Sequence, residues 1–220
     1  MKIIAVLSQK GGAGKTTLAL HLAVAAEGDG KSAAVIDLDP QASAAGWGDS
    51  RAAQAPVVIS TQASRLGPVL EAAAKAGAKF AILDTAPHSE SAALAAARAS
   101  DLVLIPCRPA ILDLRAIGST IDLVKIAGKP AVVVLNAVPP RGSLQEEAEQ
   151  AIASYGVRVA PIHLGQRAAF AHALTAGQTA QEYEPSGKAA DEVQQLYMWI
   201  CTQVNKHESQ AKSRRSAARG

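Results

Sequence analysis

The sequence predicts an α/β fold in which a doubly wound, mostly parallel sheet is flanked by helices. Short apolar runs alternate with longer segments of helical periodicity along almost the whole chain. Hydrophobic residues make up 49% of the chain but aromatic residues only 3%, so the core must consist of Ala, Val, Leu and Ile. That composition suits buried parallel strands covered by Ala-rich helices. A chain of 220 residues is long enough for one large domain with a full core.

Seven apolar runs predict the strands of this sheet. Each is short, is rich in Val, Ile, Leu or Ala, and is bounded by glycine, proline or polar residues. The runs lie at residues 2–8, 33–36, 57–60, 80–83, 102–105, 131–135 and 157–162.

The segments between these strands predict helices. Gly28 and Gly30 end the first helix, Gly77 ends the second, and Ser89 caps the third. Residues 42–50 are small and polar apart from a tryptophan, and no element is expected there. The helices are expected at residues 16–26, 66–76, 89–99, 111–127, 143–154, 168–175 and 186–206.

The chain is expected to divide into a domain of residues 1–205 and a basic, disordered tail of residues 206–220. The tail has five basic residues and one acidic residue, a net charge of +4, so the body carries −1 of the chain's +3. A nearly neutral body is weak evidence for nucleic-acid binding by the domain itself. After Asn205 the sequence is polar and has no apolar period, which is typical of disorder.

Several classes of protein are excluded by composition. The apolar run after Lys2 is too short for a secretory signal, and no run approaches the roughly 20 residues that span a membrane. Cys107 and Cys201 are far apart and neither belongs to a CxxC pair, so we expect no zinc or iron–sulfur site. These features predict a cytoplasmic protein.

A glycine-rich loop follows the first strand and predicts a phosphate-binding site. Glycines let successive backbone N–H groups point at an anion, and the helix that follows directs its positive end at the same place. Lys15 adds a full charge, and the Thr16 hydroxyl suits a magnesium ion. The predicted nucleotide contacts of this loop are Lys10, Gly11, Gly12, Ala13, Gly14, Lys15, Thr16 and Thr17.

Carboxylates follow two other buried strands. Asp84 ends an apolar run of four residues, as the magnesium-supporting Asp of a Walker B strand does. Asp37 and Asp39 flank Leu38, and residues at i and i+2 of an extended chain face the same way. Because strands of a doubly wound sheet bring their carboxyl ends to one edge, we expect these groups beside the loop.

The loop Lys10–Thr17 and the stretch Asp37–Gln41 together resemble the ParA/MinD family of ATPases, whose deviant Walker A motif carries an additional lysine. Gln9 stands where the common P-loop has its first glycine. The resemblance implies a P-loop NTPase fold that hydrolyses ATP slowly with Mg²⁺. It also implies that Lys10 reaches the phosphates of a second subunit in an ATP-bound homodimer.

The same resemblance implies roles for individual residues. Lys10, Lys15 and Asp39 would act in catalysis, with Asp39 positioning the attacking water, while Thr16, Asp37 and Asp84 would serve the magnesium ion. Asn136 would hydrogen-bond the adenine, and the segment beginning at Pro161 would form the other wall of the base pocket. Arg108, Asp113 and Gln41 would lie near the dimer interface.

The family likeness further implies partners and a cellular role. Such ATPases bind DNA without sequence preference, and the candidate contacts are Arg167, Lys188, Arg214, Arg215 and other basic residues of the tail. The predicted function is segregation of plasmid or chromosome DNA with a centromere-binding, ParB-type partner, in association with the nucleoid. The chain resembles the short group that lacks an N-terminal helix-turn-helix.

Two alternatives remain open. The first is ParA-like positioning of a protein cargo, such as a chemoreceptor cluster or a microcompartment, because the partner determines the cargo. The second, less favoured, is a MinD-like ATPase that binds a membrane. That reading requires an apolar face on the C-terminal segment, and residues 206–220 contain no Leu, Ile, Phe or Trp.

Overall fold

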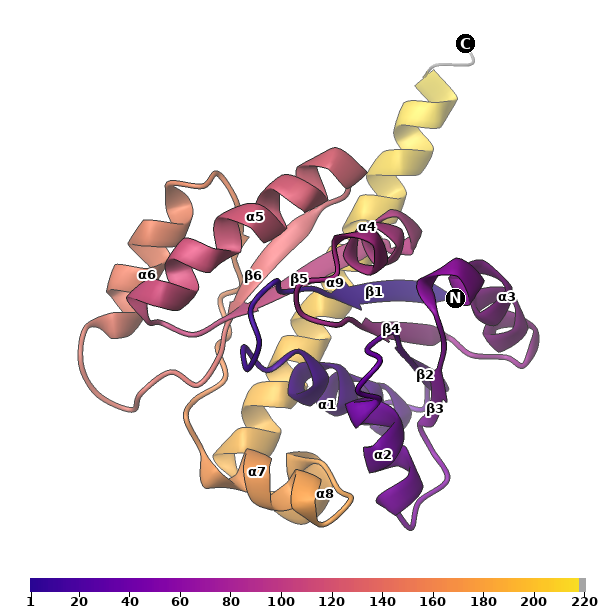
Figure 1. Ribbon diagram of the computed structural model, residues 1–220, viewed down its shortest axis with the longest axis horizontal. Helices are drawn as coiled ribbons and strands as arrows, with labels where there is room; N and C mark the ends of the chain where they lie inside the picture. Colours follow the sequence, from indigo (N-terminus) through magenta and orange to yellow (C-terminus); the bar gives the residue numbers. More distant parts are fainter. Residues whose placement is uncertain (218–220) are drawn as a thin grey trace.

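A single sheet of seven parallel strands forms the centre of the computed structural model (Figure 1). The structure describes the backbone of residues 1–217 and the side chains of residues 1–206. The order of the strands is β3-β2-β4-β1-β5-β6-β7. The strands are β1 (Lys2–Val6), β2 (Ala33–Asp37), β3 (Val57–Ser60), β4 (Phe80–Asp84), β5 (Leu102–Cys107), β6 (Ala131–Leu135) and β7 (Arg158–Val159).

Helices cover both faces of the sheet, as Figure 1 shows. Alternate residues of each strand point to opposite faces, so each face has its own apolar cluster. Helices α1 (Lys15–Gly28), α2 (Ser43–Ser50), α7 (Ala168–Thr175), α8 (Ala180–Tyr183) and α9 (Lys188–Ala217) lie on one face. The other face carries α3 (Leu66–Lys75), preceded by a short 3₁₀ turn (Ala63–Arg65), with α4 (Glu90–Ala99), α5 (Ile111–Ala127) and α6 (Leu144–Ala153). The predicted doubly wound fold is therefore confirmed.

The position of β1 determines where the site forms. This first strand lies between β4 and β5 and pairs with both in parallel. Val6, its last residue, is opposite Asp84 of β4, and Asp84 is in turn opposite Asp37 of β2. The carboxyl ends of β1, β2 and β4 thus meet at one edge of the sheet, as the sequence predicted.

Several elements differ from the prediction. Residues 43–50, which were expected to be irregular, form α2, and its Trp47 is buried in the core. The strand expected at 157–162 is only the two residues of β7, because the chain then turns toward the bridge between Val138 and Gly165. Helix α8 was not expected at all.

The last helix also differs, because α9 continues beyond residue 206 to Ala217. Residues 207–217 include Ala, Lys, Arg, Gln and Glu, which are good helix formers. The side chains of Arg214 and Arg215 lie outside the described residues, and so does Arg219. The division into a domain and a separate basic tail stays a prediction.

Membrane spans were searched within the described part of the chain. No helix there is long and apolar enough to cross a bilayer.

Candidate functional site

A cavity of about 610 Å³ opens at the carboxyl ends of β1, β5 and β6. The glycine loop and the first turn of α1 form its floor, with Gly11, Gly12, Gly14, Lys15, Thr16 and Thr17 lining it. Asp39, Pro87 and Arg108 line it from other strand ends. The remaining wall consists of Asn136, Ala137, residues 165–167 and three residues of α7, namely Phe170, Ala171 and Leu174. Its volume falls in the range of small-ligand sites.

The shape of the loop requires a glycine at position 14. Gly14 has a φ of 94°, and a Cβ there would lie 2.0 Å from Nδ2 of Asn136. The reason for this close approach is that the Asn136 amide donates a hydrogen bond of 2.8 Å to the carbonyl oxygen of Ala13. The loop is therefore held against the end of β6 by a side chain.

Lys15 begins α1 and is only 6% exposed. Its Nζ donates to the carbonyl oxygen of Lys10 at 3.2 Å, which places the ammonium beneath the loop. Burial lowers the pKa of Lys15, whereas the nearby carboxylates of Asp84 and Asp39 raise it. A buried ammonium at the floor of the cavity suits an anion such as a phosphate.

Asp84 is 1% exposed, and neither of its carboxylate oxygens has a hydrogen-bond partner among the described residues. The pKa of Asp84 is raised to about 7, mainly by burial and also by the carboxylate of Asp37. The Thr16 hydroxyl and the Lys15 ammonium lower it, so both lie near the carboxylate without completing a hydrogen bond to it. Unsatisfied buried oxygens are costly, and a cation with its water shell would satisfy them.

The donor set fits a magnesium ion that arrives with a nucleotide. In the part of the chain that the structure describes, no group of three or more His, Cys, Asp or Glu residues could hold a metal alone. Magnesium in such sites is typically held by one or two protein oxygens together with phosphate oxygens and waters. Thr16 and Asp84 are the residues here that would hold it.

The two other predicted carboxylates behave differently from each other. Asp39 lines the cavity, and its Oδ1 accepts a hydrogen bond from the backbone N–H of Gln41 at 2.9 Å. Asp37 is fully buried, and its two oxygens accept bonds of 3.0 Å from the backbone N–H groups of Asp39 and Ala45. Asp37 therefore shapes the loop that leads into α2, and a direct role toward magnesium stays a prediction.

Lys10 is the first residue of the loop and does not line the cavity. Its Nζ forms an ion pair of 2.8 Å with Oδ2 of Asp113, in the first turn of α5. The Asp113 side chain is 10% exposed and that of Lys10 is 34% exposed. Lys10 was predicted to reach a second subunit. In the single chain it is instead paired with Asp113 of the same chain.

The residues predicted to hold the base are only partly brought to the cavity. Asn136 lines it, although its amide is occupied: Nδ2 bonds to Ala13, and Oδ1 accepts from the N–H of Ala137 at 2.9 Å. Pro161 is exposed and does not line it. The segment after β7 approaches the cavity only where it bridges to Val138, so Gly165 and Gln166 form the wall instead.

Three of the predicted DNA contacts have described side chains, and they lie at different places in the fold. Arg167 lines the cavity and forms an ion pair with Glu192 of α9. Lys188 is exposed at the start of α9. Lys206, on the same helix, lies about 27 Å farther along at 1.5 Å per residue.

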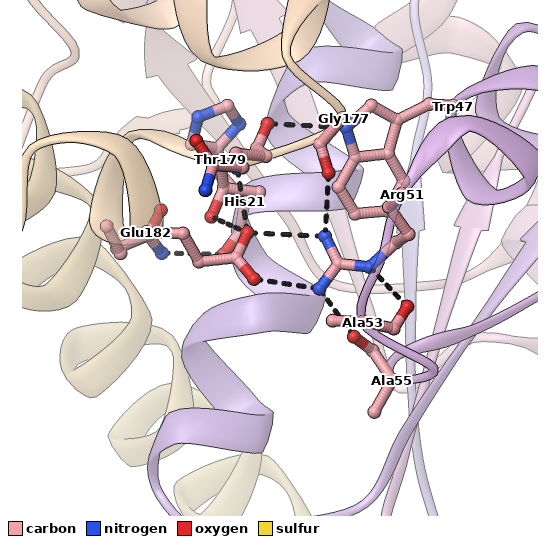
Figure 2. A network of polar contacts seen from close by, with 10 residues as sticks. His21, Trp47, Arg51, Ala53, Ala55, Gly177, Thr179 and Glu182 are labelled. Carbon is pink, nitrogen blue, oxygen red and sulfur yellow. Dashed lines mark hydrogen bonds and ion pairs between the residues drawn. The ribbon is translucent and has the colours of Figure 1, made fainter.

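A buried polar network, which the sequence reasoning missed, attaches α7 and α8 to the rest of the molecule (Figure 2). The Arg51 guanidinium, 4% exposed as a side chain, forms an ion pair with Glu182 at 2.8 Å and donates to the carbonyl oxygens of Ala53, Ala55 and Gly177. Its guanidinium carbon lies 4.4 Å from the ring centroid of Trp47. The end of α2 is thereby joined to the segment that follows α7.

His21 makes the second attachment of this network (Figure 2). It is fully buried in α1, and its Nδ1–H donates to the carbonyl oxygen of Thr17 at 2.7 Å. Its Nε2 accepts from the N–H of Ala180 at 3.0 Å. Burial lowers the pKa of His21 to about 4, so the ring is neutral. The helix that starts at the phosphate loop therefore also supports the wall of the cavity.

A sequence pattern indicates one part of this network. Thr179 and Glu182 form a capping box at the start of α8, a pattern of Thr followed three residues later by Glu. The pairing of Arg51 with Glu182 spans 131 residues of sequence and has no such local signal.

Known proteins resemble this chain over most of its length. The family model described as the CobQ/CobB/MinD/ParA nucleotide binding domain matches residues 4–180. Two relatives are named "Maintenance of carboxysome distribution protein A". The one from Halothiobacillus neapolitanus is 30% identical over 205 residues, which cover 88% of this chain and 93% of the relative. The one from Gloeobacter kilaueensis is 31% identical over 210 residues, which cover 93% and 94%.

Among solved structures, the cell division ATPase MinD of Pyrococcus furiosus superposes with a TM-score of 0.73. It is 22% identical, and the match covers 92% of this chain and 99% of that one. That likeness shows a common fold. Because the family model spans most of the residues that build the sheet and the cavity, the chain belongs to the CobQ/CobB/MinD/ParA family of nucleotide-binding domains, as the resemblance of its loop predicted.

Proposed function

We propose that this chain is an ATP-dependent switch that positions a protein assembly of the carboxysome kind within the cell. The observation that carries the proposal is the phosphate cavity, in which Lys15 and the unsatisfied carboxylate of Asp84 lie beside a glycine loop. The names of the two relatives support the cargo, since both refer to carboxysome distribution. They favour the alternative of a protein cargo over segregation of DNA.

In this proposal the chain's own residues bind and orient ATP. The backbone N–H groups of the loop and the Lys15 ammonium hold the phosphates, while Thr16 and Asp84 support Mg²⁺, which neutralises phosphate charge. Asp39, at the rim of the cavity, orients the attacking water. Catalysis then consists of positioning and charge stabilisation, which accounts for hydrolysis that is slow without a partner.

The switch requires a second copy of the chain and further partners. With ATP bound, Lys10 would leave Asp113 and contact the phosphates of the second copy. The dimer would bind non-specific DNA as a track, and a small adaptor protein on the cargo would stimulate hydrolysis and release it. Lys188 and the basic residues of 206–220 remain the proposed DNA contacts, whereas Arg167 is neutralised by Glu192.

Plasmid or chromosome partition, with a ParB-type partner, is the second proposal. The same site and switch would serve it, and only the adaptor would differ. Membrane association stays the least favoured reading, because no Leu, Ile, Phe or Trp occurs in residues 206–220.

One experiment separates a DNA-tethered switch from a constitutive enzyme. Retention of the chain on a DNA-coated surface is measured with ATP, with ADP and without nucleotide, at moderate salt. We expect retention only with ATP and Mg²⁺. Equal retention with ATP, with ADP and without nucleotide would refute the switch.

The cargo is tested in the native cell by deleting the gene. Loss of even spacing of microcompartments, with plasmids inherited normally, supports the protein cargo. Plasmid loss with normal microcompartments would replace it with the partition reading.

A further inference from the structure

The segment that follows β5 places an arginine over the phosphate loop. Because β5 lies next to β1 and runs parallel to it, the residue after β5 emerges beside the loop that follows β1. That residue is Arg108. A Cβ added to Gly12 would lie 3.5 Å from Nη2 of Arg108, so the guanidinium lies close above the loop. Arg108 also lines the cavity, together with Gly11 and Gly12.

The backbone of this arginine is held while its side chain is not. The carbonyl oxygen of Arg108 accepts hydrogen bonds from the N–H of Ala110 at 2.8 Å and from Sγ of Cys107 at 3.3 Å. In contrast, no hydrogen bond or ion pair of the guanidinium is found within residues 1–206, whose side chains are described. A guanidinium without a partner, on a backbone that is held in place, is suited to bind an anionic ligand.

The other cations near the loop already have partners. The Lys15 ammonium bonds to the carbonyl oxygen of Lys10 and lies near two carboxylates. Lys10 is paired with Asp113, and Arg167 with Glu192. Of the basic side chains that line the cavity, Arg108 alone lacks a hydrogen-bond or ion-pair partner within the described residues.

We propose that Arg108 is a phosphate-binding residue of its own chain's nucleotide site, where its guanidinium contacts the phosphates of the nucleotide held by the glycine loop. A planar guanidinium suits phosphate oxygens because it donates two parallel hydrogen bonds. This inference rests on the proposed nucleotide binding. It differs from the sequence-based expectation, in which Arg108 is a residue of the dimer interface.

The test uses MgADP and dilute protein, so that binding is measured in single chains. Titration calorimetry of the full chain is combined with mass photometry to establish that the protein is monomeric. Arg108→Gln is expected to weaken MgADP binding by at least about tenfold, as expected for a lost hydrogen bond to a charged group. Arg108→Lys keeps the positive charge but cannot donate two parallel hydrogen bonds, so it is expected to lose less MgADP affinity than Arg108→Gln.

Arg115→Gln is the matched control, because Arg115 is exposed on α5 and does not line the cavity. It removes the same charge and is expected to leave MgADP affinity unchanged. Equal weakening by both variants would indicate a general charge effect and overturn the proposal. Thermal melts establish whether each variant is folded. If Arg108→Gln does not fold, Arg108→Lys still tests the proposal.

The remaining outcomes separate this inference from the proposed function. If the unmodified chain binds no MgADP, the proposed function fails and this inference fails with it. If the unmodified chain binds and Arg108→Gln binds equally well, only the inference fails. Unchanged MgADP affinity combined with loss of the ATP-bound dimer would assign Arg108 to the interface instead.

Discussion

At the scale of single residues, the two lysines of the loop have separate environments and should have separate effects. Lys15 is buried beneath the loop, whereas Lys10 is partly exposed and paired with Asp113. We predict that Lys15→Gln abolishes nucleotide binding, because the phosphates lose their buried cation. Lys10→Gln should keep part of the nucleotide affinity and lose the ATP-dependent dimer. Calorimetry and analytical ultracentrifugation measure the two effects, and a Lys10→Gln chain that dimerises normally would contradict this assignment.

The ion pair between Lys10 and Asp113 should oppose dimer formation, since it must break before the lysine can reach another chain. We predict that Asp113→Asn lowers the ATP concentration needed for half-maximal dimer by up to about fivefold, corresponding to at most about 1 kcal/mol for such a pair. Asp122→Asn, which affects an exposed pair with Lys125 on the same helix, is the control. A higher ATP requirement in Asp113→Asn would mean that the carboxylate is needed within the dimer.

At the scale of elements, the joint between α1 and α8 depends on an uncharged histidine. The pKa of His21 is about 4 in the folded protein, below the 6.5 of an unburied histidine. The unfolded chain therefore binds the proton more tightly, and stability falls as the pH decreases below about 6.5. The Glu182 carboxylate nearby opposes this effect but does not outweigh burial.

We predict that between pH 8 and pH 5 the unmodified chain loses about 2 kcal/mol more unfolding free energy than His21→Gln does. Urea denaturation at several pH values measures the difference. Subtracting the variant's curve removes the contribution of the other titrating groups. Parallel curves would show that His21 is not held neutral by this joint.

The elements also show which features a sequence can predict. Helix α5 and strand β6 have the predicted bounds because their apolar periods are long or uninterrupted. Helix α2 was missed because the Asp37 carboxylate, outside the helix, binds the N–H of Ala45 within it. Likewise, the loop, Asp39 and Asp84 were predicted from motifs, whereas the links of Asn136 to Ala13 and of Lys10 to Asp113 join distant segments and required the fold.

At the scale of the whole molecule, we expect that the chain folds equally well without its C-terminal segment, residues 207–220. Val204 is the last buried hydrophobic residue of α9 within the described part of the chain. Residues 207–220 carry four basic side chains and one acidic side chain, a net charge of +3. We predict that a chain ending at Lys206 keeps its melting temperature within about 2 °C, as surface changes usually do.

The same truncated chain should bind DNA with a smaller dependence on salt. If all four basic side chains contact phosphates, the magnitude of the slope of log K against log salt decreases by about 3.6. Retention assays at several salt concentrations measure this slope. An unchanged slope would assign DNA binding to the domain alone.

The central place of β1 has a consequence for synthesis on the ribosome. This strand and the phosphate loop are the first segments to emerge, but β1 pairs with β4 and β5, which end at Asp84 and Cys107. Its loop further needs Asn136, and α1 needs Ala180. Such non-local pairing forms slowly. The nascent chain must therefore carry an apolar strand that lacks at least one of its two partners until nearly half of it has been translated, and its nucleotide site is completed only near the end of translation.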